Sequence, residues 1–281
     1  YEEGNYPVSW RNSKFKRTNN FFDQRFAAIQ LNSIYDSNLL FKGFGFISNQ
    51  NRGIPGLVWS PLQAALDDQI LMLGLNIKRY LRFGESEIKL MKRSAQEVYS
   101  NPTYSIFSQN KINTFSAHFN NTFYVNNMLE SEFGISFENQ ELNSSNYNHT
   151  EKSFIEFLNF KFSLPKSLFF YPSLEKIHSG KKINKTTFSI LLSYIPIKSI
   201  IENLSFSRSS HFRKPTFNDL YWIPGGNPEL NPENGNNINA NLKLRLRALG
   251  LFNINLFKSE TDNMIQWLPI QSYWKATNIN K

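Results

Sequence analysis

The chain has 281 residues, and its 40% apolar content is too high for a disordered protein. It contains no cysteine, which excludes disulfides, thiolate metal sites and cysteine nucleophiles. The net charge of +9 is compatible with nucleic acid, anionic lipid or an anionic substrate, but the basic residues are scattered singly, which argues against nucleic acid. No apolar run reaches the roughly 18 residues of a transmembrane helix. The opening YEEGNYPVSW lacks the basic and apolar regions of a signal peptide, so we expect any such segment upstream or removed.

Alternation of apolar and polar residues with period two runs through the chain. In 71–77, 133–137 and 238–246, every second residue is apolar. A strand separates such residues onto two faces, whereas a helix mixes them. In chain order, the pattern predicts strands at 20–36, 38–49, 66–82, 86–99, 110–126, 129–142, 152–164, 167–178, 185–195, 199–212, 236–247 and 250–266.

The connections between these predicted strands alternate in length. Tight links are expected near 37–40, 82–85, 126–128, 164–167, 195–198 and 247–250, and longer polar segments at 50–64, 100–109, 143–150, 179–184 and 213–235. Short turns on one side and long loops on the other are typical of outer-membrane barrels. A water-soluble β-sandwich or repeat array is the alternative at this point, since alternation within one segment is a weak signal.

No catalytic constellation is visible. The four histidines are widely separated, and the chain has no paired-histidine motif, nucleophile elbow or glycine-rich phosphate loop. Glu229 and Glu233 could reach one calcium ion, together with Asn227 or Asn231, but solvated turn residues are the simpler reading. We therefore expect no enzyme activity, no metal site and no cofactor.

Two sets of side chains are candidates for ligand contact or for a polar lumen. The tryptophans and tyrosine of the predicted loops either contact a ligand or form aromatic girdles at a membrane interface: Trp59, Tyr221, Trp222, Trp267 and Trp274. The basic residues Lys243, Arg245 and Arg247 share the polar face of one predicted strand. Each cation would cost about 2–4 kcal/mol if it faced hydrocarbon near the midplane, so in a barrel they are expected to face the lumen.

The stretch RKPTFNDLYWIPGGNPELNPENG, residues 213–235, carries a family resemblance. With the preceding strand it resembles the signature of TonB-dependent outer-membrane receptors. The matching residues are Arg213, Pro215, Thr216, Phe217, Asn218, Asp219, Leu220, Tyr221 and Trp222, then Gly226, Asn227, Pro228, Glu229, Leu230, Pro232 and Glu233. The segments NRGIPGLVWSP and TDNMIQWLPIQSYWKATNIN resemble two further surface loops of these receptors. The resemblance is closest to cobalamin- and siderophore-type receptors.

The resemblance implies an all-β, transmembrane antiparallel β-barrel, of which this chain supplies about a dozen strands out of roughly 22. Residues 1–281 are then one partial barrel domain, and the plug domain and TonB box lie outside this chain. The implied function is active uptake of a scarce metal chelate, a ferric siderophore, haem or cobalamin, across the bacterial outer membrane. The implied partners are the TonB-ExbB-ExbD complex, the chelate, outer-membrane lipid and lipopolysaccharide, without nucleic acid.

Three alternatives accompany this reading: a passive porin, a family receptor for oligosaccharide or peptide, and a soluble β-rich protein. Within the quoted stretch, four prolines limit chain freedom and Gly225-Gly226 permit a turn, so its first expected role is rigid architecture. For ligand contact within it, Arg213, Tyr221 and Trp222 are the candidates.

Overall fold

The structure is a computed structural model, and it describes residues 2–3, 7–10, 13–57, 60–180, 183–197, 199–247, 249–270 and 272–279. Strands dominate it. They are β1 (Glu2–Glu3), β2 (Pro7–Trp10), β3 (Ser13–Lys16), β4 (Phe21–Asp36), β5 (Leu39–Leu57), β6 (Ser60–Leu81), β7 (Gly84–Asn101), β8 (Ile106–Asn126), β9 (Leu129–Ser144), β10 (Asn148–Leu164), β11 (Leu168–Ser179), β12 (Ile183–Tyr194), β13 (Ile201–Arg213), β14 (Glu233–Leu246), β15 (Gly250–Asp262), β16 (Met264–Ile270) and β17 (Tyr273–Ile279).

The helices are short: the 3₁₀ turns η1 (Pro102–Tyr104) and η2 (Pro165–Ser167), and the α-helix α1 (Phe217–Tyr221). Within the described ranges, no helix has the length and apolar character needed to cross a bilayer. Hydrogen bonding orders the strands β1-β4-β5-β6-β7-β8-β9-β10-β11-β12-β13-β14-β15 in one sheet, with β2-β3 and β16-β17 as separate two-stranded sheets. Each long strand thus pairs with its sequence neighbour, which confirms the all-β prediction.

The twelve predicted strands correspond to β4 through β15. The predicted loops at 50–64 and 143–150 were wrong in extent, because β5 continues to Leu57, β6 begins at Ser60, β9 ends at Ser144 and β10 begins at Asn148. An antiparallel ladder propagates by backbone hydrogen bonds, which do not require alternating side chains. The predicted strand 250–266 ends earlier, since Asn263 has a φ of 55° and separates β15 from β16.

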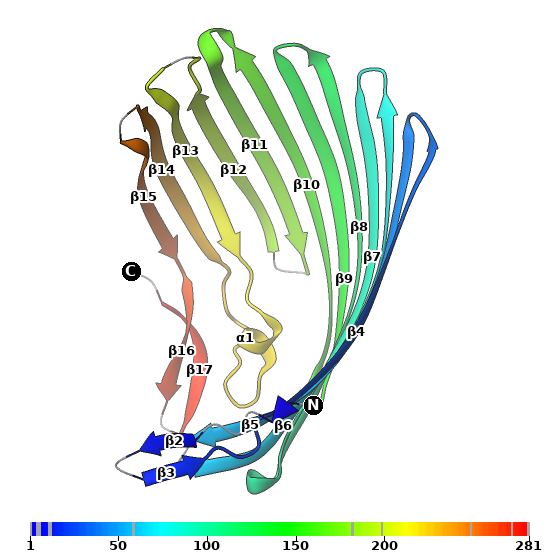
Figure 1. The fold of residues 1–281 in the computed structure, drawn as a ribbon, viewed down its shortest axis with the longest axis vertical. Coiled ribbons are helices and arrows are strands. Elements are labelled where there is room, and N and C mark those ends of the chain that lie inside the picture. Colours follow the sequence, from blue (N-terminus) through cyan, green and yellow to red (C-terminus); the bar gives the residue numbers. More distant parts are fainter. Residues whose placement is uncertain are drawn as a thin grey trace. The chain divides into compact units, whose positions relative to one another are not determined.

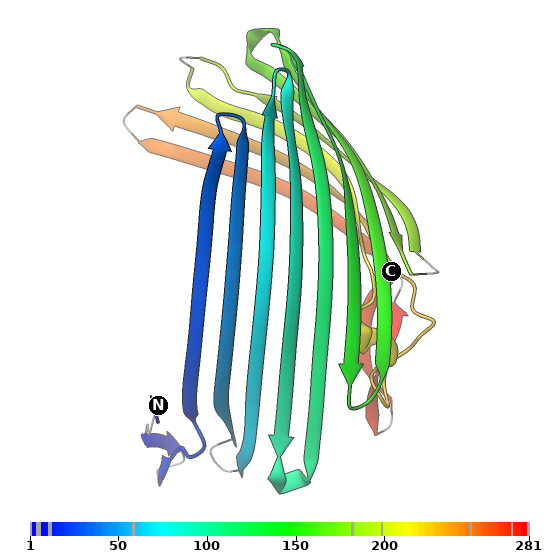
Figure 2. The same cartoon turned by 90° about the vertical axis from the view of Figure 1, so that its right-hand side faces the viewer.

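The described chain forms two compact units: Tyr1–Ile77 with Lys89–Ala117 and Glu138–Glu151, and Lys78–Ile88 with His118–Phe137 and Lys152–Lys281. In the first unit, β4 and β5 run as neighbouring antiparallel strands at the blue end of the chain (Figure 2). In the second unit, β11 to β15 form a succession of antiparallel neighbours (Figure 1).

One side chain in the first unit holds the RGIPG segment in place. The Asn19 amide Nδ2 lies 3.1, 3.0 and 2.7 Å from the carbonyl oxygens of Ile54, Leu62 and Ala64. A Cβ on Gly53 would lie 2.3 Å from the Asn19 carbonyl oxygen. The resemblance at this segment therefore reflects a close backbone approach that requires glycine.

One face of the second unit is apolar and exposed. The registers align Leu192, Phe206, Ala240 and Leu256 across β12 to β15. The side chains of Leu192, Phe206 and Leu256 are 40%, 50% and 68% exposed. Such a row has no protein layer over it, and this exposure suits a sheet that meets hydrocarbon on that side.

The opposite face of the same strands is polar. Ser193, Ser205, Asn241 and Asn255 stand in register one residue away from the apolar row. The Asn241 amide Nδ2 donates to Asn253 Oδ1 at 2.6 Å, on the same face. At these positions the sheet therefore presents apolar groups on one side and polar groups on the other, as alternation predicted.

Side-chain oxygens close two of the tight turns. Asn38 N donates to Asp36 Oδ1 at 2.6 Å in the link between β4 and β5. In the link between β8 and β9, Asn126 Oδ1 accepts from Met128 N at 2.8 Å and Leu129 N at 2.9 Å. Asn and Asp favour such turns because their side chains can accept from nearby backbone N–H groups.

We expect Gly84→Ala to destabilise the full-length protein, because a Cβ there would lie 1.9 Å from the Thr122 carbonyl oxygen in the neighbouring strand β8. Overpacking of this kind costs about 1–3 kcal/mol. Gly43→Ala is the matched control, since its nearest atom would be 4.0 Å away. The measurement is the temperature at which the folded band is lost in heat-modifiable gel migration. A lower temperature for Gly84→Ala alone is expected, and equal shifts would contradict the proposed clash.

Candidate functional site

The loop between β13 and β14 begins with a capped helix. Thr216 is the N-cap of α1, and its N and Oγ1 donate to Asp219 Oδ2 at 2.9 and 2.8 Å. Asp219 N donates back to Thr216 Oγ1 at 3.2 Å. This reciprocal capping box satisfies backbone donors that a short helix leaves open. The residues PTFND therefore encode the start of a helix.

Asp219 joins this helix to the β16–β17 hairpin. The residue is buried, with a relative exposure of 6%. Trp267 Nε1, on β16, donates to Asp219 Oδ1 at 2.9 Å, and Arg213 Nη1 lies 3.7 Å from Oδ2. A buried carboxylate is costly unless it is paired and hydrogen-bonded, and here both oxygens have partners. Asp219 thus fixes the helix, the end of β13 and the indole of Trp267 together.

A bidentate ion pair closes the base of the loop. Arg213, the last residue of β13, donates from Nε and Nη2 to the two carboxylate oxygens of Glu233, the first residue of β14, at 2.7 and 2.5 Å. Ile265 N donates to Glu233 Oε1 at 2.6 Å. The hydrogen bonds from Arg213, aided by that from Ile265, hold the pKa of Glu233 below its usual value although burial opposes the shift. The loop ends are therefore joined by charge-assisted bonds as well as by the ladder.

The loop and the hairpin also share backbone bonds. Ala276 N, on β17, donates to the Gly225 carbonyl oxygen at 2.8 Å. A Cβ on Gly225 would lie 1.8 Å from the Trp274 carbonyl oxygen, so no side chain fits there. Asn278 Nδ2 donates to the carbonyl oxygens of Asn231 at 3.0 Å and Asn263 at 2.7 Å.

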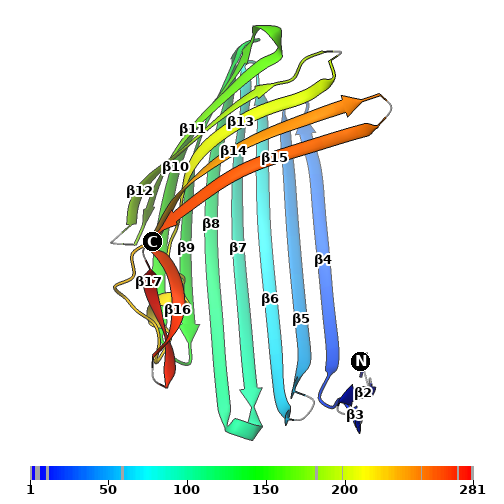
Figure 3. The same cartoon turned by 90° about the vertical axis from the view of Figure 1, so that its left-hand side faces the viewer.

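A small apolar cluster fills the space between the two segments. Leu230, Ile265 and Ala276 are buried, and Leu220 and Trp267 pack against them. Figure 3 shows the β16–β17 hairpin following directly on β15. The loop and hairpin therefore form one rigid assembly, which we call the loop assembly, made of residues 213–233, 264–270 and 272–279.

An aromatic hollow lies on the loop assembly. Its volume is about 490 Å³, and it is lined by Asn218, Trp222, Pro224, Trp267, Tyr273 and Trp274. Three of the predicted ligand-contact residues thus meet here: Trp222, Trp267 and Trp274. Tyr221 is on α1 and does not line the hollow. Arg213 forms ion pairs with Asp219 and Glu233, and Trp59 lies outside the described residues.

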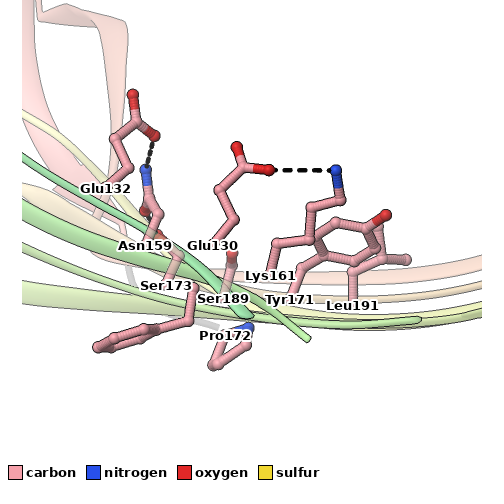
Figure 4. Close-up of a pocket in the computed structure, with 10 residues that line it drawn as sticks. Glu130, Glu132, Asn159, Lys161, Tyr171, Pro172, Ser173, Ser189 and Leu191 are labelled. Atoms are coloured by element: carbon pink, nitrogen blue, oxygen red, sulfur yellow. Dashed lines mark hydrogen bonds and ion pairs between the residues drawn. The ribbon is translucent and has the colours of Figure 1, made fainter. Parts of the chain in front are cut away.

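A second hollow, of about 390 Å³, lies on the polar face of β9 to β12 (Figure 4). Lys161 Nζ donates to Glu130 Oε2 at 3.3 Å. Asn159 Nδ2 donates to Glu132 Oε2 at 2.8 Å and its Oδ1 accepts from Ser173 Oγ at 2.5 Å. The carboxylates of Glu130 and Glu132 thus accept hydrogen bonds from side chains of β10. The residues around this hollow form a polar wall.

Two of the three basic residues predicted to face the lumen have an acidic partner, Glu202, which the sequence did not indicate. Glu202 forms ion pairs with Lys243 Nζ, at 3.1 Å, and with Arg245 Nε. The register places Lys243 and Asn203 opposite each other on the polar face, while Arg247 lies in the turn after β14. Glu202 reaches both cations because the register shifts between Ile201 and Asn203, an irregularity with no signal in the alternation.

The sequence left open a calcium site at Glu229 and Glu233. The Glu233 carboxylate instead accepts hydrogen bonds from Arg213 and the Ile265 amide, which argues against this site. Among the described residues, no group of three or more His, Cys, Asp or Glu is placed to hold a metal ion. The sequence did not identify Asp219 and Glu233 as the residues that hold the loop assembly together. The spacing of Thr216 and Asp219 as a capping box was the available signal for the first of them.

Comparisons with known proteins agree with this geometry. A family model described as TonB dependent receptor-like, beta-barrel, matches residues 3–281. Two proteins named Vitamin B12 transporter BtuB are similar over short segments. That of Vibrio vulnificus is 34% identical over 76 residues, which are 26% of this chain and 12% of that protein. That of Photobacterium profundum is 39% identical over 66 residues, which are 24% of this chain and 11% of that protein.

Solved structures show the fold. The copper transporter OprC superposes with a TM-score of 0.77 at 11% identity, covering 95% of this chain and 49% of that one. The siderophore receptor PirA from Pseudomonas aeruginosa also gives 0.77 at 11% identity, covering 95% and 53%. The chain thus spans about half the length of these structures. The predicted fold class, an antiparallel outer-membrane β-barrel of which a part is present, is confirmed.

We expect Glu233→Gln to weaken the loop assembly and to reduce its acid sensitivity. Glu233 is the first of the 14 residues of β14, at the loop end of the strand, and about 9–11 residues suffice to cross a bilayer. Because its pKa is lowered in the folded loop, the stabilisation is fully present above the unfolded-state pKa of about 4.3 and is lost as pH falls through the folded-state value. Because the Arg213 side chain is half exposed, solvent screens the ion pair. The expected loss in the free energy of opening the loop at pH 7 is therefore about 1–2 kcal/mol.

Hydrogen exchange of residues 216–230 in the full-length protein, corrected for the intrinsic effect of pH, measures this. We expect faster exchange in Glu233→Gln at pH 7 and a smaller increase on acidification than in the wild type. Glu97→Gln, at an exposed position on β7, controls for charge removal. An unchanged acid response in Glu233→Gln would contradict the assignment.

Proposed function

Because the chain belongs to the TonB dependent receptor-like β-barrel family, we propose that the whole protein is an active-transport receptor of the bacterial outer membrane for a scarce metal chelate. The chelate is a ferric siderophore, haem or cobalamin, and the energy comes through TonB. The family match over nearly the whole chain is the observation that carries this proposal. The names of the relatives, vitamin B12 transporter, copper transporter and siderophore receptor, support the substrate class.

The physical need fits a receptor better than a pore. A passive channel lets a solute equilibrate, so it cannot accumulate one that is rare outside the cell. Tight binding followed by an energy-driven release can accumulate it. The chemistry required is binding and release, so no covalent step is part of the proposal.

The two faces of the sheet support an orientation. The exposed apolar row on β12 to β15 faces lipid, and the polar face, with Lys243, Arg245 and the wall of Figure 4, lines the lumen. Residues 1–281 are then one part of the barrel domain. The proposed partners are the TonB-ExbB-ExbD complex, acting through a plug and TonB box outside this chain, and lipopolysaccharide around the rim.

Among the ligand-contact candidates, we give Arg213 an architectural role first, and the contacts of three of its nitrogens with Glu233 and Asp219 support this. Trp222 and Trp274 are 37% and 59% exposed, which supports their role as contact residues at the surface. Tyr221 and Trp59 stay as predictions.

Uptake by the full-length protein tests the proposal. Cells that depend on it are supplied with labelled cobalamin, haem or a ferric siderophore, with and without TonB. We expect saturable uptake of one chelate that is lost without TonB. Non-saturable uptake that survives loss of TonB would identify a porin, and growth supported only by an oligosaccharide or peptide would identify the other branch of the family.

Charge selection by the lumen is a separate expectation. Neutralising Lys243, Arg245 and Arg247 to glutamine should lower uptake of an anionic chelate more than that of a neutral one, because the cations concentrate anions near the wall. The effect should shrink at high salt. Glu202→Gln, which frees two of the cations from their partner, should act in the opposite direction. Equal losses for both chelates would rule charge selection out.

A further inference from the structure

Cations interrupt the exposed apolar face of the second unit. On β11, Leu174 is followed two residues later by Lys176, and on β13, Phe206 is followed two residues later by Arg208. Both cations are exposed, as are the two apolar residues before them. Residues i and i+2 of a strand share a face. On both strands, a positive charge therefore ends the apolar part of the face that meets lipid.

Both cations stand at the depth where a strand leaves the hydrocarbon. The strands β11 and β13 run in the same direction, toward the edge that carries the long 214–232 connection (Figure 1). In outer-membrane barrels, long connections are extracellular. Lys176 is the ninth residue of β11, which starts at Leu168, and Arg208 is the eighth of β13, which starts at Ile201. Because a strand crosses in about 9–11 residues, these positions correspond to the outer-leaflet boundary.

Both ladder neighbours of Arg208 are apolar. They are Ile190 on β12 and Ile238 on β14. The guanidinium carbon lies 5.9 Å from the centre of the Phe188 ring. This contact keeps the stem along the apolar face, while the planar head reaches the polar boundary. The head offers five N–H donors in a fork that matches the oxygens of a phosphate.

The lysines at the same depth have acidic neighbours. Glu156 stands opposite Lys176 in the ladder between β10 and β11. Lys258, the ninth residue of β15, pairs with Glu260 at 2.8 Å, and their side chains are 69% and 55% exposed. Exposed ion pairs are weak, so a phosphate can compete with these carboxylates. Arg208 is therefore the principal cation of the row, and Lys176 the second.

We propose that Arg208 and Lys176 bind phosphate groups of a glycolipid in the outer leaflet. The inference goes beyond the proposed uptake function and rests on the proposed orientation of the sheet, whatever the solute. The occupant must place hydrocarbon against the apolar row and an anionic head at the depth of the cations. A free phosphate lacks the first part, and a neutral lipid lacks the second. Lipopolysaccharide, the proposed lipid partner, carries both.

The test uses the full-length protein purified in a nonionic detergent. The probes are diphosphoryl lipid A, which is the membrane anchor of lipopolysaccharide, and the same lipid with both phosphates removed. Native mass spectrometry measures bound lipid per protein across a titration at constant ionic strength. We expect tighter binding of the phosphorylated lipid and no displacement by inorganic phosphate.

Variants locate the binding. Arg208→Gln and Lys176→Gln should each weaken binding of the phosphorylated lipid about fivefold, the value of one basic residue near an anionic membrane surface. Arg208→Lys should retain most of the affinity, because it keeps the charge. Glu156→Gln should strengthen binding, because it removes the carboxylate opposite Lys176.

Lys185→Gln is the matched control. Lys185 is in register with Ile177, the residue after Lys176, and so lies on the opposite face of the sheet. It removes the same charge and should leave lipid binding unchanged. Unchanged heat-modifiable migration shows that each variant is folded, and the gain expected for Glu156→Gln cannot come from misfolding.

Equal binding of the phosphorylated and dephosphorylated lipids would overturn the proposal. Equal losses in Arg208→Gln and Lys185→Gln would show an effect of net charge and overturn the location. Displacement by inorganic phosphate would identify a free-anion site instead of a lipid site. TonB-dependent uptake is a separate measurement, so its failure with intact lipid binding would refute the proposed function alone.

Discussion

The structure depends on one constraint: each long strand must serve two different environments with one backbone. Period-two alternation meets it, because adjacent residues of a strand point to opposite faces. The row from Leu192 to Leu256 is apolar and uncovered, whereas the row from Ser193 to Asn255 is polar. The hydrogen-bonding groups of the polar row need water, and the apolar row needs hydrocarbon. A sheet with that division suits the barrel fold that the comparisons show.

The loop assembly follows a different principle, since the described residues around it form only a small apolar cluster. Its apolar cluster is small, and the buried carboxylates Asp219 and Glu233 provide much of the order. Each accepts hydrogen bonds from separate segments, so a single side chain fixes several pieces of backbone. Arg213 links the two carboxylates at the point where β13 leaves the sheet. Such networks are costly to break because any partner left behind is buried and unsatisfied.

Rigidity of this kind bears on recognition. The loop assembly holds the hairpin by its backbone and Trp267 by its nitrogen, which leaves ring surfaces directed outward. Residues of the family signature thus build the support, and two aromatic residues at its edge, Trp222 of the signature and Trp274, supply the exposed surface. Support and exposed surface are thus divided between neighbouring residues.

The sequence by itself determined the strand succession, the two faces and the family, because alternation and a long ordered motif are local properties. It also placed Lys243 and Arg245 on the polar face. Only the tertiary structure decided that Glu202 joins both cations through a register shift, that the ladders continue into predicted loops, and that Arg213 and Glu233 are partners. Trp222 and Trp274 are 52 residues apart, so no local pattern could bring them to one hollow. Pairings across such distances arise from backbone geometry and long-range packing, which alternation does not encode.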